Sequence, residues 1–223
     1  MELKGKIINF LGDSITEGVG VNDIKNRYDN RLKEILGLEK VNNYGIGGTR
    51  IAHQSNPSDN PRFDMCFCSR AYDMDKSADV IVVYGGVNDY MHGDAPFGVM
   101  TDSTPKTFCG GVDFLMRFLK SEYKNSVIVF MTPAHENYCD MNELKPSPRP
   151  CKFPDAKPLK DYRDVIIKKG EQYGIYVLDL SENLGIDPNC EEQKKKYTAD
   201  GLHFNDNGHA VIAEVLANYL RNI

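Results

Sequence analysis

The sequence lacks both a hydrophobic run of membrane-spanning length and a signal-like start. None of its apolar stretches approaches the ~18–20 residues that a helix needs to cross a bilayer. Residues 1–6, MELKGK, are mostly polar, so no apolar segment of signal-peptide length precedes the first predicted strand. We therefore expect no membrane span and a cytoplasmic location.

A strong excess of charge is also absent. The 27 Lys and Arg residues nearly balance the 32 Asp and Glu residues, which leaves a formal net charge of −5. A chain of this balance has no overall attraction for nucleic acid or for anionic membranes. We expect no nucleic-acid partner, and the composition leaves the oligomeric state open.

The cysteines lack the spacing of a redox or zinc motif. No Cys-x-x-Cys pair occurs, and Cys66-x-Cys68 has no histidine nearby to complete a chelate. Because no secretion signal is visible in this sequence, free thiols are expected. A disulfide stays open for one pair, Cys139 and Cys151, which flank a proline-rich loop. The six cysteines are Cys66, Cys68, Cys109, Cys139, Cys151 and Cys190.

Short apolar runs alternate with helical periods along the whole chain. Its 223 residues are 41% hydrophobic and 26% charged, as in ordinary globular proteins, and the length favours one domain, residues 1–223. Strands are predicted at residues 7–11, 41–44, 78–84, 127–131 and 175–180. Helices are predicted at residues 28–36, 63–72, 108–119, 160–173 and 207–222. This alternation predicts an α/β fold, a three-layer α/β/α sandwich around a five-stranded parallel sheet.

Candidate functional residues follow the predicted strands. Ser14 comes after the first strand, Gly48 after the second and Asn88 after the third, while Asp200 and His203 precede the last helix. The carboxyl ends of parallel strands share one edge of a sheet, so these groups can converge. Taken singly, each is also typical of a turn or a helix cap.

Together these residues match the needs of acyl transfer, which requires a nucleophile, a base, a group that orients the base and donors to the oxyanion. Ser14 is the candidate nucleophile and His203 the candidate base. Asp200, three residues before His203, is suited to fix its tautomer. The backbone N–H groups of Ser14 and Gly48 and the side-chain amide of Asn88 are the candidate oxyanion hole.

Four segments, in order, resemble the four blocks of the SGNH (GDSL-type) hydrolase superfamily. They are Gly12–Ile15, Asn43–Gly48, Gly86–Asp89 and Asp200–His203, and the resemblance spans residues 12–209. It implies a flavodoxin-like fold and a serine esterase or lipase-like acyl hydrolase. Carried over to this sequence, it gives Ser14, Gly48, Asn88, Asp200 and His203 the roles just described.

The sequence departs from the family pattern at one position and leaves another open. Ile15 replaces the usual leucine, an apolar exchange that should not affect the chemistry. The second block offers both Gly47 and Gly48. Gly48 stands five residues after Asn43, as the family spacing requires, and is the preferred donor.

Several other polar and aromatic residues have plainer interpretations. Asp13 is expected to hydrogen-bond to loop backbone and hold the serine turn, Asp89 to have a structural role, and His209 to pack or lie at the surface. His53 and His135 are expected to be exposed loop histidines that can reach a substrate. His92-x-Asp94 is half a metal site with no second half evident, so neither a metal nor a cofactor is predicted. Loops 90–106 and 134–158 should border the site, with aromatic residues Tyr90, Phe97, Tyr138 and Phe153.

The sequence therefore predicts a metal-independent serine hydrolase of small-molecule carboxylic esters. A short acyl group, such as acetyl on a carbohydrate, is favoured over a long chain because no extended apolar segment suggests a lipid-facing surface. Three alternatives stay open. They are a lysophospholipase or thioesterase, a non-catalytic ligand-binding module of the same fold, and a phosphoryl-handling enzyme that uses Gly47 and Gly48 as an anion cradle.

Overall fold

A computed structural model describes residues 2–58, 60–92, 94–140, 145, 146 and 155–223. Within these residues, five strands form one sheet in which every neighbouring pair is parallel. Its strands are β1 Ile7–Gly12, β2 Lys40–Gly45, β3 Val80–Tyr84, β4 Val127–Met131 and β7 Tyr176–Leu178. The predicted parallel sheet is therefore confirmed.

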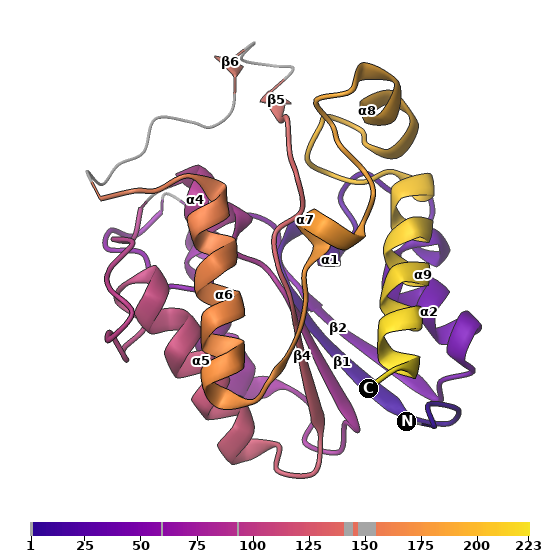
Figure 1. Cartoon of the computed structure of the whole chain (residues 1–223), viewed down its shortest axis with the longest axis horizontal. Coiled ribbons are helices and arrows are strands. Elements are labelled where there is room, and N and C mark those ends of the chain that lie inside the picture. Colours follow the sequence, from indigo (N-terminus) through magenta and orange to yellow (C-terminus); the bar gives the residue numbers. More distant parts are fainter. Residues whose placement is uncertain (1, 59, 93, 141–144, 147–154) are drawn as a thin grey trace.

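The strand order is β2-β1-β3-β4-β7 (Figure 1). β1 pairs with β2 on one side and with β3 on the other, where Gly12 lies opposite Tyr84. The chain thus reverses the direction in which it adds strands between β1 and β3. In an open parallel sheet, ligands bind at the carboxyl edge beside such a reversal. The order matches the predicted flavodoxin-like class.

Helices cover both faces of this sheet (Figure 1). α2 and α9 lie on one face and α3, α5 and α6 on the other, as the two separate apolar clusters require. The helices are α1 Ser14–Glu17, α2 Tyr28–Leu36, α3 Phe67–Arg70, α4 Val87–His92, α5 Phe108–Glu122, α6 Leu159–Tyr173, α7 Leu180–Asn183, α8 Glu191–Tyr197 and α9 Asp206–Arg221. None of the described helices is both long and apolar enough to cross a membrane.

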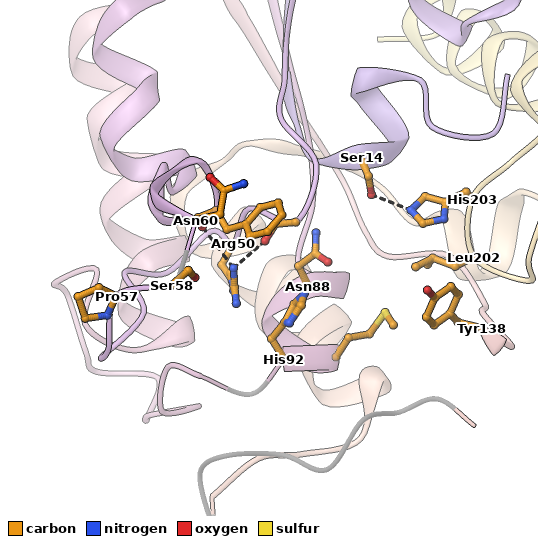
Figure 2. Close-up of a pocket in the computed structure, with 13 residues that line it drawn as sticks. Ser14, Arg50, Pro57, Ser58, Asn60, Asn88, His92, Tyr138, Leu202 and His203 are labelled. Carbon is orange, nitrogen blue, oxygen red and sulfur yellow. Dashed lines mark hydrogen bonds between the residues drawn. The ribbon is translucent and has the colours of Figure 1, made fainter. Parts of the chain in front are cut away.

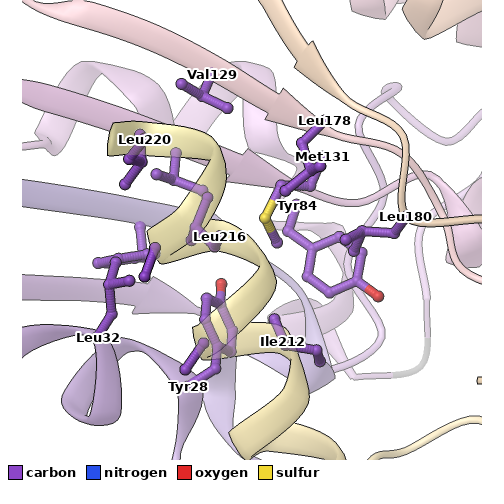
Figure 3. Packing of buried hydrophobic residues seen from close by; sticks show 14 of the residues in the cluster. Tyr28, Leu32, Tyr84, Val129, Met131, Leu178, Leu180, Ile212, Leu216 and Leu220 are labelled. Atoms are coloured by element: carbon purple, nitrogen blue, oxygen red, sulfur yellow. The ribbon is translucent and has the colours of Figure 1, made fainter. Parts of the chain in front are cut away.

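The apolar cluster beneath α2 and α9 shows why these segments form helices (Figure 3). Ile212, Leu216 and Leu220 are spaced by four residues, so they share one face of α9, and each is fully buried. They meet Leu32 of α2 and Val129 of β4 in the same cluster. Burial of each such side chain stabilises the fold by about 1.5–3 kcal/mol.

The segment predicted as one helix over residues 63–72 is broken into shorter pieces. It consists of the short 3-10 helices η2 Pro61–Asp64 and η3 Ala71–Asp73 on either side of α3. A further 3-10 helix, η1 Ile24–Asn26, precedes α2. The backbone leaves the helical region at Met65 and Cys66. There the Phe67 N–H donates to the Arg50 carbonyl, and a tertiary hydrogen bond replaces a helical one.

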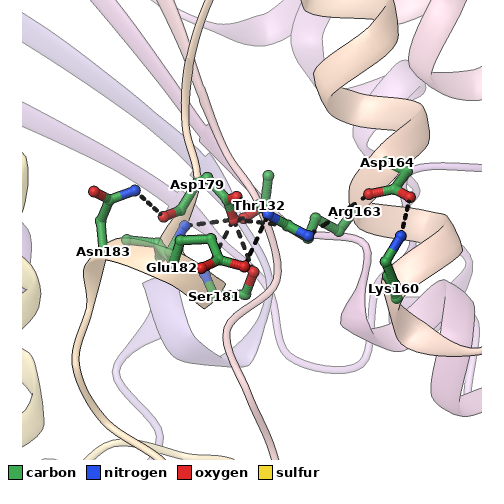
Figure 4. A network of polar contacts seen from close by, with 9 residues as sticks. Thr132, Lys160, Arg163, Asp164, Asp179, Ser181, Glu182 and Asn183 are labelled. Carbon is green, nitrogen blue, oxygen red and sulfur yellow. Dashed lines mark hydrogen bonds and ion pairs between the residues drawn. The ribbon is translucent and has the colours of Figure 1, made fainter.

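Two predicted boundaries also shift. α4 extends into the segment predicted as loop from Tyr90 onward, and the strand predicted to reach residue 180 ends at Leu178. Asp179 instead caps α7 by accepting from the Ser181 N–H. The same carboxylate accepts from Thr132 after β4 and pairs with Arg163 of α6 (Figure 4).

The long loop predicted between residues 134 and 158 contains two short strands among its described residues. β5 Cys139–Asp140 pairs antiparallel with β6 Lys145–Pro146. The structure does not test the predicted alternative of a disulfide between Cys139 and Cys151, because Cys151 and the side chain of Cys139 lie outside what it describes. Cys66, Cys68, Cys109 and Cys190 are free thiols, as predicted.

Candidate active site

Ser14 is the first residue of α1, directly after β1. Asp13 forms the N-cap, and its carboxylate accepts from the Ile15 N–H at 3.0 Å, as expected of a residue that holds this turn. Burial raises the pKa of Asp13 to about 6 in spite of that hydrogen bond. α1 sits so close to the end of β2 that a Cβ on Gly45 would overlap the backbone of Glu17. The glycine therefore lets the serine turn rest on the sheet.

The structure brings Ser14, His203 and Asp200 into one hydrogen-bonded row. Ser14 Oγ lies 3.0 Å from His203 Nε2, although the residues are 189 positions apart (Figure 2). His203 Nδ1 lies 2.6 Å from Asp200 Oδ2. The other Asp200 oxygen accepts from the backbone N–H groups of Leu202 at 3.0 Å and of His203 at 2.8 Å. A row of this kind can move a proton from the serine to the imidazole.

Two opposing effects act on the Asp200 carboxyl. Burial raises its pKa. The hydrogen bond to His203, the charge of that ring and two backbone N–H groups lower the pKa, and their combined effect outweighs that of burial. The pKa therefore lies below its usual value, and the carboxylate stays ionised beside the imidazole. An ionised carboxylate at Nδ1 keeps the proton there, which leaves Nε2 free to accept from Ser14.

The glycine loop after β2 has two N–H groups with different surroundings. Gly47 N–H donates to Glu17 Oε2 at 2.7 Å. Gly48, at a φ of +75°, donates to no backbone or side-chain acceptor among the described residues. A Cβ on Gly48 would lie 2.8 Å from the Phe63 ring, so both the conformation and the space require glycine there. The preference for Gly48 over Gly47 as the candidate donor agrees with this difference, because the Gly47 N–H is already occupied by Glu17.

Asn88 lies on α4, beyond the end of β3, and is buried. Its Nδ2 donates to the Thr49 carbonyl at 3.2 Å, which ties α4 to the glycine loop. An amide nitrogen carries two hydrogens, so this bond leaves one for another acceptor. Ser14, Gly48 and Asn88 all line the same cavity.

That cavity has a volume of about 650 Å³. Its lining combines the candidate catalytic groups with polar side chains on one side of Ser14 and apolar ones near His203 (Figure 2). The lining residues are Ser14, Gly48, Arg50, Pro57, Ser58, Asn60, Phe63, Asn88, Met91, His92, Tyr138, Leu202 and His203.

The sequence model of the GDSL-like Lipase/Acylhydrolase family matches residues 10–211. The chain belongs to this family. It is thus a GDSL-family acylhydrolase, a class of esterases and lipases. A comparison with curated protein sequences gives no match.

Solved structures resemble this GDSL-family protein over almost its full length. A protein from Lactobacillus plantarum is 28% identical over 99% of this chain and 98% of its own, with a TM-score of 0.83. A possible lipase from Chitinophaga pinensis is 22% identical over 97% and 98%, with a TM-score of 0.68. An acetyl xylan esterase is 23% identical over 96% and 99%, with a TM-score of 0.63. The last two likenesses concern the fold.

Some residues predicted near the site of this GDSL-family protein lie elsewhere. Of the four loop aromatics, Tyr138 lines the cavity, and its ring meets the His203 ring edge-on at 6.2 Å between centroids. Tyr90 of α4 and Phe97 of the following loop instead pack on Tyr162 of α6, at the edge of the apolar cluster. Phe153 falls outside the described residues.

The remaining histidines and carboxylates have other surroundings. Asp89 accepts from the backbone N–H groups of Ile51 and Ala52, so its predicted structural role is confirmed. Burial raises its pKa to about 7. His209 is fully buried and accepts the Tyr28 N–H at Nδ1. The exposed residues His53 and His135 do not line the cavity, whereas His92 does.

Two polar residues beside the site, Glu17 and Arg50, were not predicted from the sequence, and the sequence indicated Asp94 only as half of a metal site. Arg50 pairs with Asp94, 44 positions away, and both are buried. No short-range sequence pattern predicts an ion pair between residues so far apart in the chain. The residues in the described part of the chain contain no group of three or more His, Cys, Asp or Glu side chains arranged to hold a metal.

Proposed function

We propose that this protein is a serine hydrolase of carboxylic esters that works through an acyl-enzyme. The observation that carries the proposal is the row from Ser14 through His203 to Asp200, at a cavity that Gly48 and Asn88 also line. Acyl transfer needs a nucleophile, a base, an orienting acid and oxyanion donors, and this arrangement supports the proposal because it offers a candidate for each role.

In the proposed reaction, Ser14 Oγ attacks the ester carbonyl as His203 Nε2 takes its proton. Asp200 stabilises the imidazolium that forms. The carbonyl oxygen becomes an oxyanion, which accepts from the N–H groups of Ser14 and Gly48 and from the Asn88 amide. The imidazolium then gives its proton to the leaving alcohol, and the acyl group stays on Ser14. Water, activated by His203, releases the acid and restores the serine.

We further propose a short acyl group on a polar alcohol, such as an acetylated carbohydrate, as the substrate class. The polar side of the cavity contains Ser58, Asn60 and His92, which suits a ligand rich in hydroxyl groups. The likeness in fold to an acetyl xylan esterase agrees with this choice. Met91, Leu202 and Tyr138 offer a small apolar surface near His203, and they favour a longer acyl chain as the second candidate.

Hydrolysis of p-nitrophenyl esters tests the proposal. Wild type should hydrolyse the acetate faster than the octanoate, and Ser14→Ala should lower kcat by about 10⁴-fold or more. Ser121→Ala, at an exposed serine on α5, is the matched control and should keep the wild-type rate. Equal rates for wild type and Ser14→Ala would contradict the proposal.

Two further measurements separate the alternatives. A fluorophosphonate should label Ser14, detected by mass spectrometry, and the label should disappear in Ser14→Ala. A non-catalytic binding module would give no turnover of any ester. A phosphoryl-handling enzyme would hydrolyse phosphate monoesters, with a rate that EDTA lowers if a metal takes part.

A further inference from the structure

The peptide unit between Gly47 and Gly48 carries the N–H that the proposed oxyanion hole needs. Its two neighbouring peptide units are each held by a charged side chain, Glu17 on one side and Arg50 on the other. We propose that Glu17 and Arg50 are positioning residues that keep the Gly48 N–H available to the oxyanion. This inference rests on the proposed function.

Glu17 holds the peptide unit before Gly47. It stands three residues after Ser14 on α1, and its Oε2 accepts from the Gly47 N–H at 2.7 Å. Its other oxygen pairs with Arg62, which limits the rotation of the carboxylate. The nucleophile and the glycine loop are thus joined through a single side chain. Because Gly47 N–H is occupied, it does not compete with Gly48 for the oxyanion.

Arg50 holds the peptide unit after Gly48. Its Nη1 donates to the Gly48 carbonyl at 2.7 Å and to the Phe63 carbonyl at 3.2 Å. Its Nε and Nη2 both bind the Asp94 carboxylate in a two-point contact. The two side chains are each only 4% exposed, so the guanidinium has a fixed plane. A fixed guanidinium holds the Gly48 carbonyl in one direction.

The two contacts together restrict the peptide between them. Gly48 has a positive φ, and glycine can rotate more readily than other residues unless its surroundings prevent it. The Thr49 carbonyl also accepts from Asn88, so a rotated loop would shift the Asn88 amide, another proposed oxyanion donor, as well. Misplacement by about 1 Å can lower a rate by about 10²-fold. The positioning residues should therefore affect kcat rather than substrate binding.

Substitutions at Glu17 test the first contact. Glu17→Ala should lower kcat for p-nitrophenyl acetate by about 10- to 100-fold and leave KM within about threefold. Glu17→Gln should restore most of kcat, because its amide oxygen can still accept from Gly47. Glu34, exposed on α2, is the matched control, and its Ala and Gln variants should behave as wild type. An unchanged kcat in Glu17→Ala, or an equal loss in Glu17→Gln, would overturn the role of Glu17.

Arg50 needs a different design, because removing it alone takes its two-point contact away from the buried Asp94 carboxylate and destabilises that charge. The double variant Arg50→Met/Asp94→Leu removes both charges and keeps similar volumes. Thermal unfolding shows whether the double variant folds, and fluorophosphonate titration of Ser14 counts its active sites. Per active site, kcat should be about 10- to 100-fold lower than in wild type, with little change in KM. A double variant that folds with the wild-type kcat would overturn the role of Arg50. If it does not fold, Arg50→Lys is measured in its place: it keeps the charge and loses the two-point contact, and a wild-type kcat would again overturn the role.

A boronic acid that forms a tetrahedral adduct on Ser14 gives an independent measure. Its affinity should fall in Glu17→Ala by about the same factor as kcat, because the adduct uses the oxyanion donors. Failure of this inference differs from failure of the proposed function. If Ser14→Ala is inactive and Glu17→Ala fully active, only the positioning role of Glu17 is wrong. If Ser14→Ala retains full activity, the proposed function itself is wrong.

Discussion

The two halves of the candidate site are held by contacts of different range. In the nucleophile half, formed by Ser14, Asp200 and His203, the turns are fixed locally. Asp13 accepts from an N–H two residues away, and Asp200 from N–H groups two and three residues away. The side chain that must be oriented and the group that orients it are therefore neighbours in sequence.

The oxyanion half, formed by Gly48 and Asn88, depends on distant partners. Glu17 reaches Gly47 across 30 positions, Asn88 reaches Thr49 across 39, and Arg50 reaches Asp94 across 44. The nucleophile half can thus keep its local turns under many changes elsewhere, whereas the oxyanion half requires the packed loops. We expect substitutions in the first half to remove a chemical role, and those in the second to loosen a geometry.

Asp200→Asn should give the largest effect of the substitutions that sharpen this comparison. Asparagine keeps an oxygen for the backbone N–H groups of Leu202 and His203, so the local turn stays intact. Its NH₂ group donates to Nδ1 and reverses the tautomer, so Nε2 can no longer accept from Ser14. We expect kcat to fall by about 10⁴-fold, whereas thermal stability should fall only slightly, because the turn is kept and only the charge beside the imidazole is lost.

Steady-state kinetics and thermal unfolding measure the two expectations for Asp200→Asn. The control is Asp206→Asn, because Asp206 lies on the same segment but contacts Asn22 outside the site. A near-wild-type kcat in Asp200→Asn would show that the imidazole needs no orienting carboxylate.

Asn88→Ala should lower kcat by about 10²–10³-fold, or about 3–4 kcal/mol of transition-state stabilisation, because one oxyanion donor is lost. Combined with Glu17→Ala, the losses should be less than additive, since both changes weaken the same half. Combined with Asp200→Asn, they test whether the two halves act independently. Fully additive losses of Asn88→Ala and Glu17→Ala would contradict the grouping.

The smallest expected effect concerns the stability of the fold and its dependence on His209, six residues after His203. Burial lowers the pKa of His209 to about 4 from 6.5, so the folded protein keeps the ring neutral where the unfolded chain binds a proton. The stabilisation from the neutral ring is therefore complete above pH 6.5 and is lost as the pH falls toward 4, by up to about 3 kcal/mol.

His209→Asn isolates this contribution, because asparagine can still accept from the Tyr28 N–H but does not titrate. The raised pKa values of Asp13 and Asp89 act in the opposite direction over the same range, so the difference between wild type and variant is the relevant quantity. Denaturant unfolding from pH 4 to 7 should show that this difference shrinks as the pH falls. A difference independent of pH would mean that His209 does not titrate in this way.

The sequence predicted the strands of the sheet well, because runs such as Val80–Tyr84 are apolar throughout and lie buried between two helical layers. It failed over residues 63–72, where helical periodicity was overridden by a hydrogen bond from Phe67 to Arg50. It also assigned Tyr90 and Phe97 to the site. Aromatic residues suit a pocket and a core equally well, and only the packing on Tyr162 decides between them.

By itself, the sequence determined the α/β class and the set of candidate groups, because short turns and apolar periods depend on residues close together in the chain. Only the tertiary structure decided that Ser14 and His203, 189 positions apart, lie 3.0 Å from each other. It alone decided that Gly47 is occupied by Glu17 and that Arg50 fixes Gly48. These contacts join distant segments, and their geometry follows from how the loops pack at one edge of the sheet.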